Sequence, residues 1–460
     1  MDAKHEDDGS KPSLMPPHPQ LLAALQVAPG LVDAPHISQM SFGRPSLSAR
    51  TGTARGLNDG TIFPDSDFAS TVPPRRMRRA ALERAPLTGV VRVAVVLVDF
   101  PDQKMSSNAV QRFWKLFFSY GKVPTGSVTE YFSEVSNKNI SLDGEVVGPF
   151  GMPRTLREYA NNNNGTSSMP PNARTLAADA LDAAKSKITN LKQYDNDGNG
   201  YVDAFIVVHA GRGAEVTGTR NDIWSLKWVL PSVVSANGVN IYGFLTIPED
   251  AYIGVCAHEL GHLLFGWPDL YDIDQSSEGI GNWCLMAGGS WGGSPPGVQP
   301  CHPSAWCKVL QKWVTVQTPT TAESITLRDV ATSHEVYRLW TAGSATSKEY
   351  FLLENRAFSG FDRSLPGFGL IIWHIDDSKQ DNSDETHYLV AMKQADGLNQ
   401  LATSTAGRGD PGDPYPGTAD NRSFTNTSNP NSQSYSGRAT RVSVTNISDA
   451  GATMTMDIKV

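Results

Sequence analysis

The sequence has little cysteine, no long apolar run and no excess of basic residues. Only four of its 460 residues are cysteine, and no stretch of about 18 apolar residues occurs, which excludes a membrane-spanning helix. The formal net charge is −8. An acidic surface does not attract polyanions, so we expect neither a nucleic acid nor a membrane as partner.

The N-terminal region lacks the pattern of a secretory signal and any sustained hydrophobic period. It opens with Met-Asp-Ala-Lys-His-Glu-Asp-Asp, without an apolar segment behind a basic start. Residues 1–85 are rich in Pro, Ser, Gly, Asp and Arg, which predicts a disordered or extended segment. The basic run at 75–84 is either the processing site of a prosegment or a solvated charge run. We therefore set residues 1–88 apart as a polar N-terminal segment and candidate prosegment.

The remainder of the chain is rich enough in apolar residues to bury a sizeable core, with 39% hydrophobic residues and ten Trp. Up to about residue 318, the predicted elements include both strands and helices. Strands are predicted at 90–100, 140–147 and 205–208, and helices at 173–185, 251–265 and after Ser127, which opens a capping box with Glu130. This pattern predicts an α+β catalytic domain over residues 89–318.

From about residue 320 short strands alternate with turns, which predicts a C-terminal β-sandwich over residues 319–460. The predicted strands are 324–327, 335–340, 350–354, 369–375, 388–392, 441–446 and 452–460. The Gly-, Asp-, Pro- and Asn-rich stretch from about 403 to 436 is interpreted as a long loop within this domain.

Residues 258–262 read His-Glu-Leu-Gly-His, which is the most informative segment of the chain. On a helix His258 and His262 lie on one face, one turn apart, and both can reach one zinc ion. Glu259 lies close enough to take a proton from a zinc-bound water. The surrounding segment is apolar, and a metal would offset the cost of burying these polar groups. Gly266 and Pro268 are expected to end the helix.

A third zinc ligand is expected among the carboxylates that follow the helix. Asp269 is the first choice because it comes directly after the turn at Gly-Trp-Pro; Asp272 and Glu278 are the alternatives, and any of the three could instead orient a His ring. Tyr271 is a candidate for stabilising the oxyanion or lining the substrate cleft. Cys256 points away from the metal, so we do not count it as a ligand.

The run from Asp195 to Asp203 resembles the start of a calcium-binding loop. Side-chain oxygens at the expected spacing come from Asp195, Asp197, Asn199 and Asp203, and Tyr201 would contribute its backbone carbonyl. The twelfth position is Ile206 rather than Glu, and the alternative interpretation is a turn with solvated carboxylates. We expect a structural Ca²⁺ here.

Three further features have both a functional and a structural interpretation. Met286, in an apolar turn after the metal helix, is either a Met-turn below the His ligands or a core residue. His209 and Glu215 either line the substrate cleft or belong to a structural Gly-rich loop. The four cysteines, Cys256, Cys284, Cys301 and Cys307, would allow three disulfide pairings or remain reduced in a core.

The metal helix with its following Gly-Trp-Pro-Asp-Leu-Tyr-Asp, together with Leu-Met-Ala-Gly-Gly-Ser-Trp at 285–291, resembles the M6 metallopeptidases of the immune inhibitor A type. Weaker similarities extend the resemblance over most of residues 90–400. It implies a secreted, extracellular zinc endopeptidase with a zincin- or metzincin-like catalytic domain, calcium-stabilised structure and often a prosegment.

These observations together predict a monomeric metalloendopeptidase that hydrolyses peptide bonds of protein substrates. Zinc would be held by His258, His262 and Asp269 and would lower the pKa of its bound water, with Glu259 as general base. Two alternatives are a catalytically silent, calcium-dependent binding or adhesion protein and a zinc amidase acting on a non-peptide amide. An intact Glu259 favours an enzyme over the first alternative.

Overall fold

The computed structural model describes residues 12–27, 54–55, 62–63, 86–403 and 407–460. The chain forms two compact units. Unit 1 comprises Met1–Phe132 and Ile140–Trp267, and unit 2 comprises Ser133–Asn139 and Pro268–Val460. Each unit is described by itself. The basic run at 75–84, interpreted above as a candidate processing site, lies outside the described residues.

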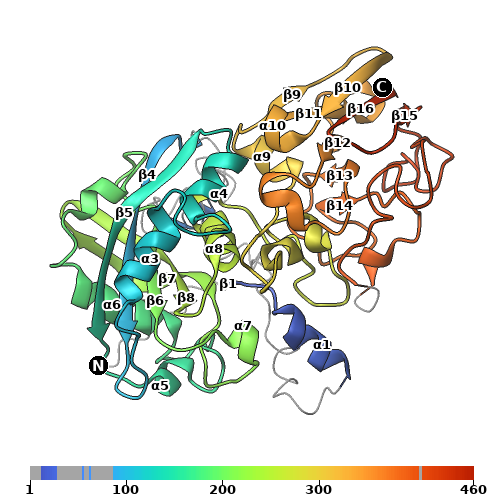
Figure 1. Ribbon diagram of the computed structural model, residues 1–460. Helices are drawn as coiled ribbons and strands as arrows, with labels where there is room; N and C mark the ends of the chain where they lie inside the picture. The colour runs from blue at the N-terminus through green and yellow to red at the C-terminus, as the bar shows by residue number, and fades with distance from the viewer. Residues whose placement is uncertain (1–11, 28–53, 56–61, 64–85, 404–406) are drawn as a thin grey trace, which may run out of the picture. The chain divides into compact units, whose positions relative to one another are not determined.

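Unit 1 is built on a mixed six-stranded sheet of order β1-β7-β8-β6-β4-β5 (Figure 1). Strand β4 lies parallel to β5 and β6, and β6 lies parallel to β8, whereas β7 pairs antiparallel with β8 and with β1. The strands are β1 (Ser13–Leu14), β4 (Gly89–Asp99), β5 (Ile140–Gly151), β6 (Phe205–His209), β7 (Leu226–Ala236) and β8 (Val239–Pro248). Strand β4 is a continuous apolar run because it is an inner strand of the sheet, buried from Val93 to Val98.

Helices of the same unit pack on this sheet, with α6 contacting four of its strands and α8 contacting β7 and β8. The helices are α1 (Pro19–Val27), α3 (Ala109–Phe118), α4 (Val128–Val135), α5 (Leu156–Ala160), α6 (Ala173–Ala184), α7 (Ala214–Thr217) and α8 (Ile253–Phe265). The predicted capping box is present. The backbone N–H of Ser127 donates to Glu130 Oε2 at 2.8 Å, and Ser127 Oγ accepts from the N–H of Glu130 at 3.2 Å.

Residues 12–27 are ordered, which differs from the disordered or extended segment predicted for 1–85. Strand β1 pairs with the edge strand β7, and Met15 bonds to Ser225 and Trp224: its N–H donates to Ser225 O at 3.0 Å, and its carbonyl accepts from Trp224 Nε1 at 2.7 Å. Leu14 and Met15 are buried. A strand this short between prolines leaves no hydrophobic period in the sequence, so pattern analysis cannot detect it.

Unit 2 contains a three-stranded sheet of order β10-β16-β15 and a five-stranded sheet of order β14-β13-β12-β11-β9. The strands are β9 (Thr315–Gln317), β10 (Glu323–Arg328), β11 (Glu335–Trp340), β12 (Glu349–Arg356), β13 (Gly369–Asp376), β14 (Val390–Met392), β15 (Ser443–Thr445) and β16 (Thr453–Lys459). Each of the seven strands predicted after residue 320 is present. The unit also holds helices α9 (Ala305–Leu310) and α10 (Val330–Ser333).

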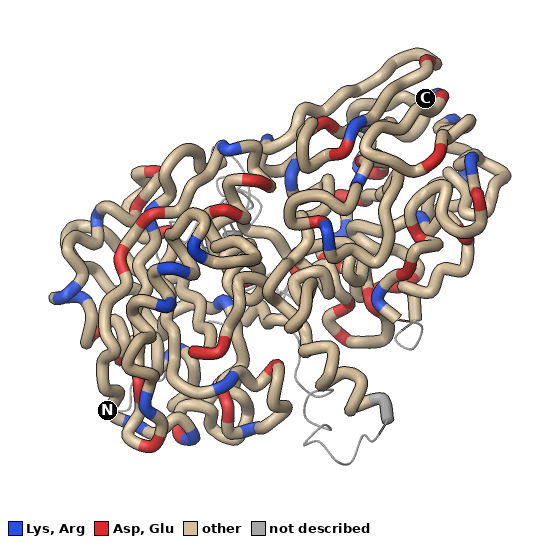
Figure 2. The backbone as a smooth tube through the Cα atoms, in the orientation of Figure 1, with Lys and Arg blue, Asp and Glu red and all other residues tan. Residues whose placement is uncertain are grey.

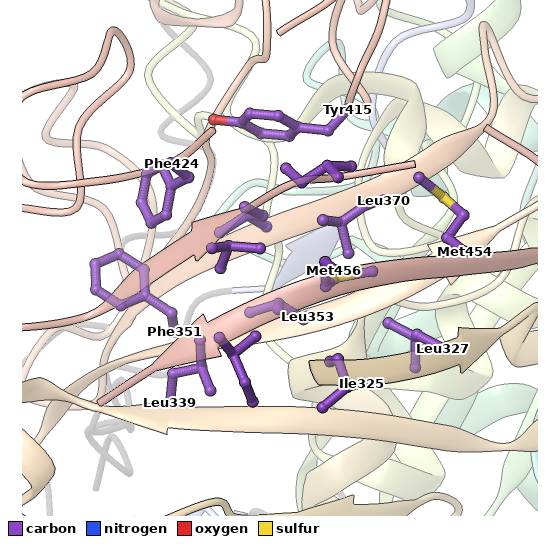
Figure 3. Close-up of a cluster of buried hydrophobic side chains, with 14 of the residues drawn as sticks. Ile325, Leu327, Leu339, Phe351, Leu353, Leu370, Tyr415, Phe424, Met454 and Met456 are labelled. Atoms are coloured by element: carbon purple, nitrogen blue, oxygen red, sulfur yellow. The ribbon is translucent and has the colours of Figure 1, made fainter. Parts of the chain in front are cut away.

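Both sheets of unit 2 contribute to one hydrophobic core (Figure 3). Alternate residues of the strands point into it, including Ile325 and Leu327 from β10, Leu353 from β12, and Met454 and Met456 from β16. The alternation of hydrophobic residues in these strands therefore reflects a core that lies on one side of each sheet.

The sequence prediction missed the β7–β8 hairpin, whose turn residues Asn237 and Gly238 both have positive φ, and it missed helix α3. The main boundary between the two compact units falls after Trp267, whereas the sequence predicts a domain boundary at residue 318. The mixed helices and strands agree with the predicted α+β class. Within the residues that the structure describes, no helix is long and apolar enough to cross a bilayer. Lys and Arg are interspersed with Asp and Glu over the backbone of both units (Figure 2).

Candidate metal centre

Helix α8 is buried along its whole length, from Ile253 to Phe265. Its apolar residues pack against β7 and β8. The helix ends at Gly266, whose φ of 65° is left-handed and favours glycine. Pro268 then prevents the helix from continuing. The predicted helix and its stop are confirmed.

The imidazoles of His258 and His262 face each other across one turn of α8. Their Nε2 atoms are 3.1 Å apart, and the ring planes are nearly perpendicular at 85°. The backbone carbonyl of Trp267 lies 2.6 Å from His262 Nδ1. A proton on Nδ1 that donates to this carbonyl leaves the Nε2 lone pair directed at the space between the rings, which is how metal-binding histidines are commonly oriented.

Asp269 is the carboxylate that joins this pair. One ligand atom each from His258, His262 and Asp269 lie within 4.8 Å of one another. Glu259 is fully buried on the same helix. It precedes His262 by three residues, so the two side chains share a side of the helix.

The two alternative third ligands are engaged elsewhere in unit 2. Asp272 accepts hydrogen bonds from Ser276 and Ser277, and from the backbone N–H of Asp274 at 3.0 Å. Glu278 Oε2 accepts from Arg408 Nε at 3.0 Å. Burial raises the pKa of both carboxyl groups. Of the three carboxylates, only Asp269 is grouped with the two imidazoles.

The predicted calcium loop brings three carboxylates together. Asp195, Asp197 and Asp203 each offer an oxygen within 4.8 Å of the others. The loop is tightly folded, because Asp195 accepts from the N–H groups of Asn199 and Gly200, and Asn199 Oδ1 accepts from the N–H of Tyr201 at 2.7 Å. Gly198 has a φ of 74° at the sharp turn. Ile206 lies in β6, as predicted.

His209 and Glu215 do not suit the cleft-lining role considered from sequence, because both side chains are fully buried. His209 Nδ1 lies 3.0 Å from the carbonyl of Ala210, and burial lowers the pKa of this imidazole to about 4. Glu215 accepts hydrogen bonds from the hydroxyl and the N–H of Ser225. Burial raises the pKa of Glu215 to about 7. The alternative, structural interpretation fits these contacts better.

Met286 and Tyr271, two further candidates from the sequence, lie in unit 2. Met286 is buried, and its carbonyl accepts from the N–H of Leu270 at 2.8 Å. Tyr271 is also buried, with 6% of its surface exposed. The roles of Met286 below the His ligands and of Tyr271 at the oxyanion stay predictions. All four cysteines are free and buried, in agreement with reduced thiols in a core.

Comparison with known proteins identifies the family. The catalytic domain of immune inhibitor A peptidase M6 matches residues 115–316, a range that includes α8 and Asp269. The pre-pro-metalloprotease PrtV of Vibrio cholerae serotype O1 is 30% identical over 269 residues, which cover 47% of this chain and 29% of the relative. Immune inhibitor A of Bacillus thuringiensis subsp. alesti is 31% identical over 207 residues, which cover 37% of this chain and 29% of the relative.

The chain thus spans less than a third of the length of these curated relatives. Its His-Glu-Leu-Gly-His helix lies inside the matched catalytic region, and the family is one of peptidases that depend on a metal. Residues 115–316 of the chain therefore match the catalytic domain of the M6 family of metallopeptidases.

Proposed function

We propose that this protein is a zinc-dependent endopeptidase that hydrolyses peptide bonds of protein substrates. The observation that carries the proposal is the pair of buried imidazoles, with Nε2 atoms 3.1 Å apart, in one group with the Asp269 carboxylate. The proposal includes a zincin-like catalytic domain and a β-sandwich as the C-terminal domain. The catalytic domain would be residues 89–318, and residues 1–88 would be a prosegment.

The donor set suits zinc. Two nitrogens that share a tetrahedral zinc ion, each about 2.0–2.1 Å from it, lie about 3.3 Å apart. The distance between His258 Nε2 and His262 Nε2 is close to this value. Two His and one carboxylate leave a fourth position of the tetrahedron open, as catalytic zinc sites require. The Trp267 carbonyl supports this assignment because it holds His262 in the ring orientation that binding requires.

Zinc held by His258, His262 and Asp269 would polarise the scissile carbonyl and make water acidic enough to deprotonate near neutral pH. Glu259 is the general base in this proposal: its carboxylate accepts a proton from the attacking water and then donates that proton to the leaving amine nitrogen. Its burial in α8 keeps competing solvent away from this proton transfer. His262 needs no proton transfer of its own, because its Nδ1 proton stays with the Trp267 carbonyl.

The other parts of the proposal rest on local geometry and on the family. The Asp195 loop binds a structural Ca²⁺, for which three clustered carboxylates and the turn at Gly198 give support. Asn199 and the carbonyl of Tyr201 complete that ligand set. An extracellular location and a monomeric state follow from the sequence interpretation.

The test is the substitution Glu259→Gln, which keeps the size of the side chain but removes the base. We expect hydrolysis of casein to fall by at least about a hundredfold, while zinc content measured by atomic emission stays at one ion per chain. The matched control is Glu385→Gln, a half-buried carboxylate of unit 2, which should leave hydrolysis unchanged. Hydrolysis at the wild-type rate by the zinc-bound Glu259→Gln variant would refute the base assignment. If the wild type hydrolyses only non-peptide amides, the amidase alternative is favoured.

A further inference from the structure

Two loops of unit 2 bring together three carboxylates that no sequence motif connects. Asp396 follows β14 in a turn, and Asp410 and Asp413 lie in the segment Asp-Pro-Gly-Asp. One oxygen from each of the three lies within 4.8 Å of the others. Among the described residues, no Lys, Arg or His forms an ion pair with any of them, and the nearby Arg408 pairs with Glu278. Like charges this close repel unless a cation or a proton lies between them.

Asp413 is the buried member of this cluster and carries an oxygen without a hydrogen bond. Only 1% of the residue is exposed. Its Oδ2 accepts from Trp283 Nε1 and from the N–H of Asp410, both at 3.0 Å. Its Oδ1 is fully buried, and no donor among the described residues reaches it. A carboxylate oxygen buried in this way is costly unless it meets a donor or a cation.

Three side-chain oxygens converge beside Gly412. A Cβ atom at this glycine would lie 2.7 Å from Asp396 Oδ2, 3.0 Å from Asp410 Oδ1 and 3.0 Å from Thr418 Oγ1. Oxygens from three residues therefore lie against the face of Gly412 that carries no side chain, and a Cβ atom there would push them apart. Gly412 does not have a positive φ, so its backbone would accept alanine. Close approach, rather than backbone conformation, is what glycine provides here.

We propose that Asp396, Asp410 and Asp413, with Thr418, form a further cation site in this protein, and that its ligand is a second Ca²⁺. The donor set consists only of oxygen, which hard cations prefer, and carboxylates from two separate loops form the irregular, flexible cage that calcium accepts better than magnesium. The site is distinct from the Asp195 loop, which belongs to unit 1, and it does not depend on the proposed peptidase activity.

A cation here would fasten the segment that carries the Met286 turn. Trp283 Nε1 donates to Asp413, and the N–H of Asn282 donates to the carbonyl of Arg408 at 2.7 Å. Tyr415 lies two residues after Asp413, and its N–H and carbonyl exchange hydrogen bonds with Leu370 of β13. Calcium would thus link the 408–415 loop, the turn at 281–286 and the five-stranded sheet, all within unit 2.

The experiment uses the full chain with Asp197→Asn, which disables the Asp195 loop, and measures Ca²⁺ by equilibrium dialysis. Terbium emission, excited at a wavelength that Trp absorbs and Tyr does not, reports an ion near a Trp side chain, and Trp283 contacts Asp413 at this site. We expect the parent to bind a Ca²⁺ that displaces Tb³⁺, and Asp413→Asn to lose that one equivalent together with the emission. Gly412→Ala, which keeps every carboxylate but forces the oxygens of Asp396, Asp410 and Thr418 apart, should lose it too.

The matched control is Asp420→Asn, an exposed carboxylate of the same loop region that pairs with Arg422, and it should bind Ca²⁺ like the parent. The proposal is overturned if the parent shows no Trp-sensitised emission that Ca²⁺ displaces, in which case a shared proton satisfies the cluster. It is also overturned if Asp413→Asn and Gly412→Ala bind as much Ca²⁺ as the parent. The parent measurement needs no change in unit 2, so a poorly folding variant does not leave the proposal undecided.

Discussion

The third ligand of the proposed zinc site gives the sharpest prediction, because three carboxylates within ten residues of one another compete for the role. We expect Asp269→Asn to weaken zinc binding strongly and Asp272→Asn and Glu278→Gln to leave it nearly unchanged. The reason is geometric. Asp269 lies within 4.8 Å of both imidazoles, whereas Asp272 is held by Ser276 and Ser277, and Glu278 is held by Arg408.

The magnitude follows from what the side chain does in each case. Losing a residue that only orients a ligand typically costs 10- to 100-fold in metal affinity. Losing a ligand itself should cost at least the upper end of that range, about 2.7 kcal/mol for a hundredfold change. Asp272→Asn should instead reduce the stability of unit 2, because the amide replaces one carboxylate oxygen that accepts hydrogen bonds from Ser276 and Ser277.

The assay is competition for zinc between the protein and a chromophoric chelator, with circular dichroism to verify folding of each variant. Glu259→Gln serves as the background for all three variants, so that proteolysis during the measurement is suppressed. The reasoning is wrong if Asp269→Asn holds zinc as tightly as its parent, or if Asp272→Asn or Glu278→Gln is the variant that releases it.

Two further predictions concern buried charge. Burial raises the pKa of Glu215 to about 7 in the folded protein, from an ordinary value of about 4.5. The folded state therefore loses stability relative to the unfolded state as the pH rises through this window, and Glu215→Gln should gain up to about 3 kcal/mol over wild type between about pH 4.5 and pH 7. Urea titrations at both pH values measure this difference, and a difference independent of pH would contradict the prediction. Lys308→Met leaves the fully buried Glu354 with Arg356 as its remaining ionic partner and should lower the free energy of unfolding by about 3 kcal/mol. Lys379→Met, which breaks the more exposed pair with Asp384, should lower it by less than about 1 kcal/mol. Equal losses of stability in thermal unfolding would refute the argument.

The local parts of the fold were predictable because they depend on residues close in the sequence. The capping box at Ser127 and Glu130, the apolar run of β4 and the alternation in the strands of unit 2 each leave a pattern within a few residues. Strand β1 and the β7–β8 hairpin were not detected. Two residues between prolines show no period, and β7 mixes buried and exposed positions without regular alternation.

The candidate site divides in the same way. The four-residue spacing fixes His258 and His262 on one face of a helix once α8 forms, and the helix forms because its surroundings are apolar and Gly266 can end it. His209 and Glu215 were considered for the cleft because they follow a buried strand in a Gly-rich segment. Glu215 is buried where α7 meets the segment before β7, and His209 is buried in β6 beside Phe100. These are contacts between distant segments, which no local pattern shows.

The amino-acid sequence by itself therefore determined that His258, Glu259 and His262 lie on one buried helix, because periodicity and spacing act over one or two turns of chain. The proximity of Asp269, which the sequence interpretation ranked first, to the two imidazoles and the meeting of Asp396 with Asp410 and Asp413 are properties of the tertiary structure. Which of these side chains lie close together depends on the paths of the loops that connect the packed helices and strands. A loop's composition indicates that it turns, whereas its neighbours in space depend on the packing of every element it connects.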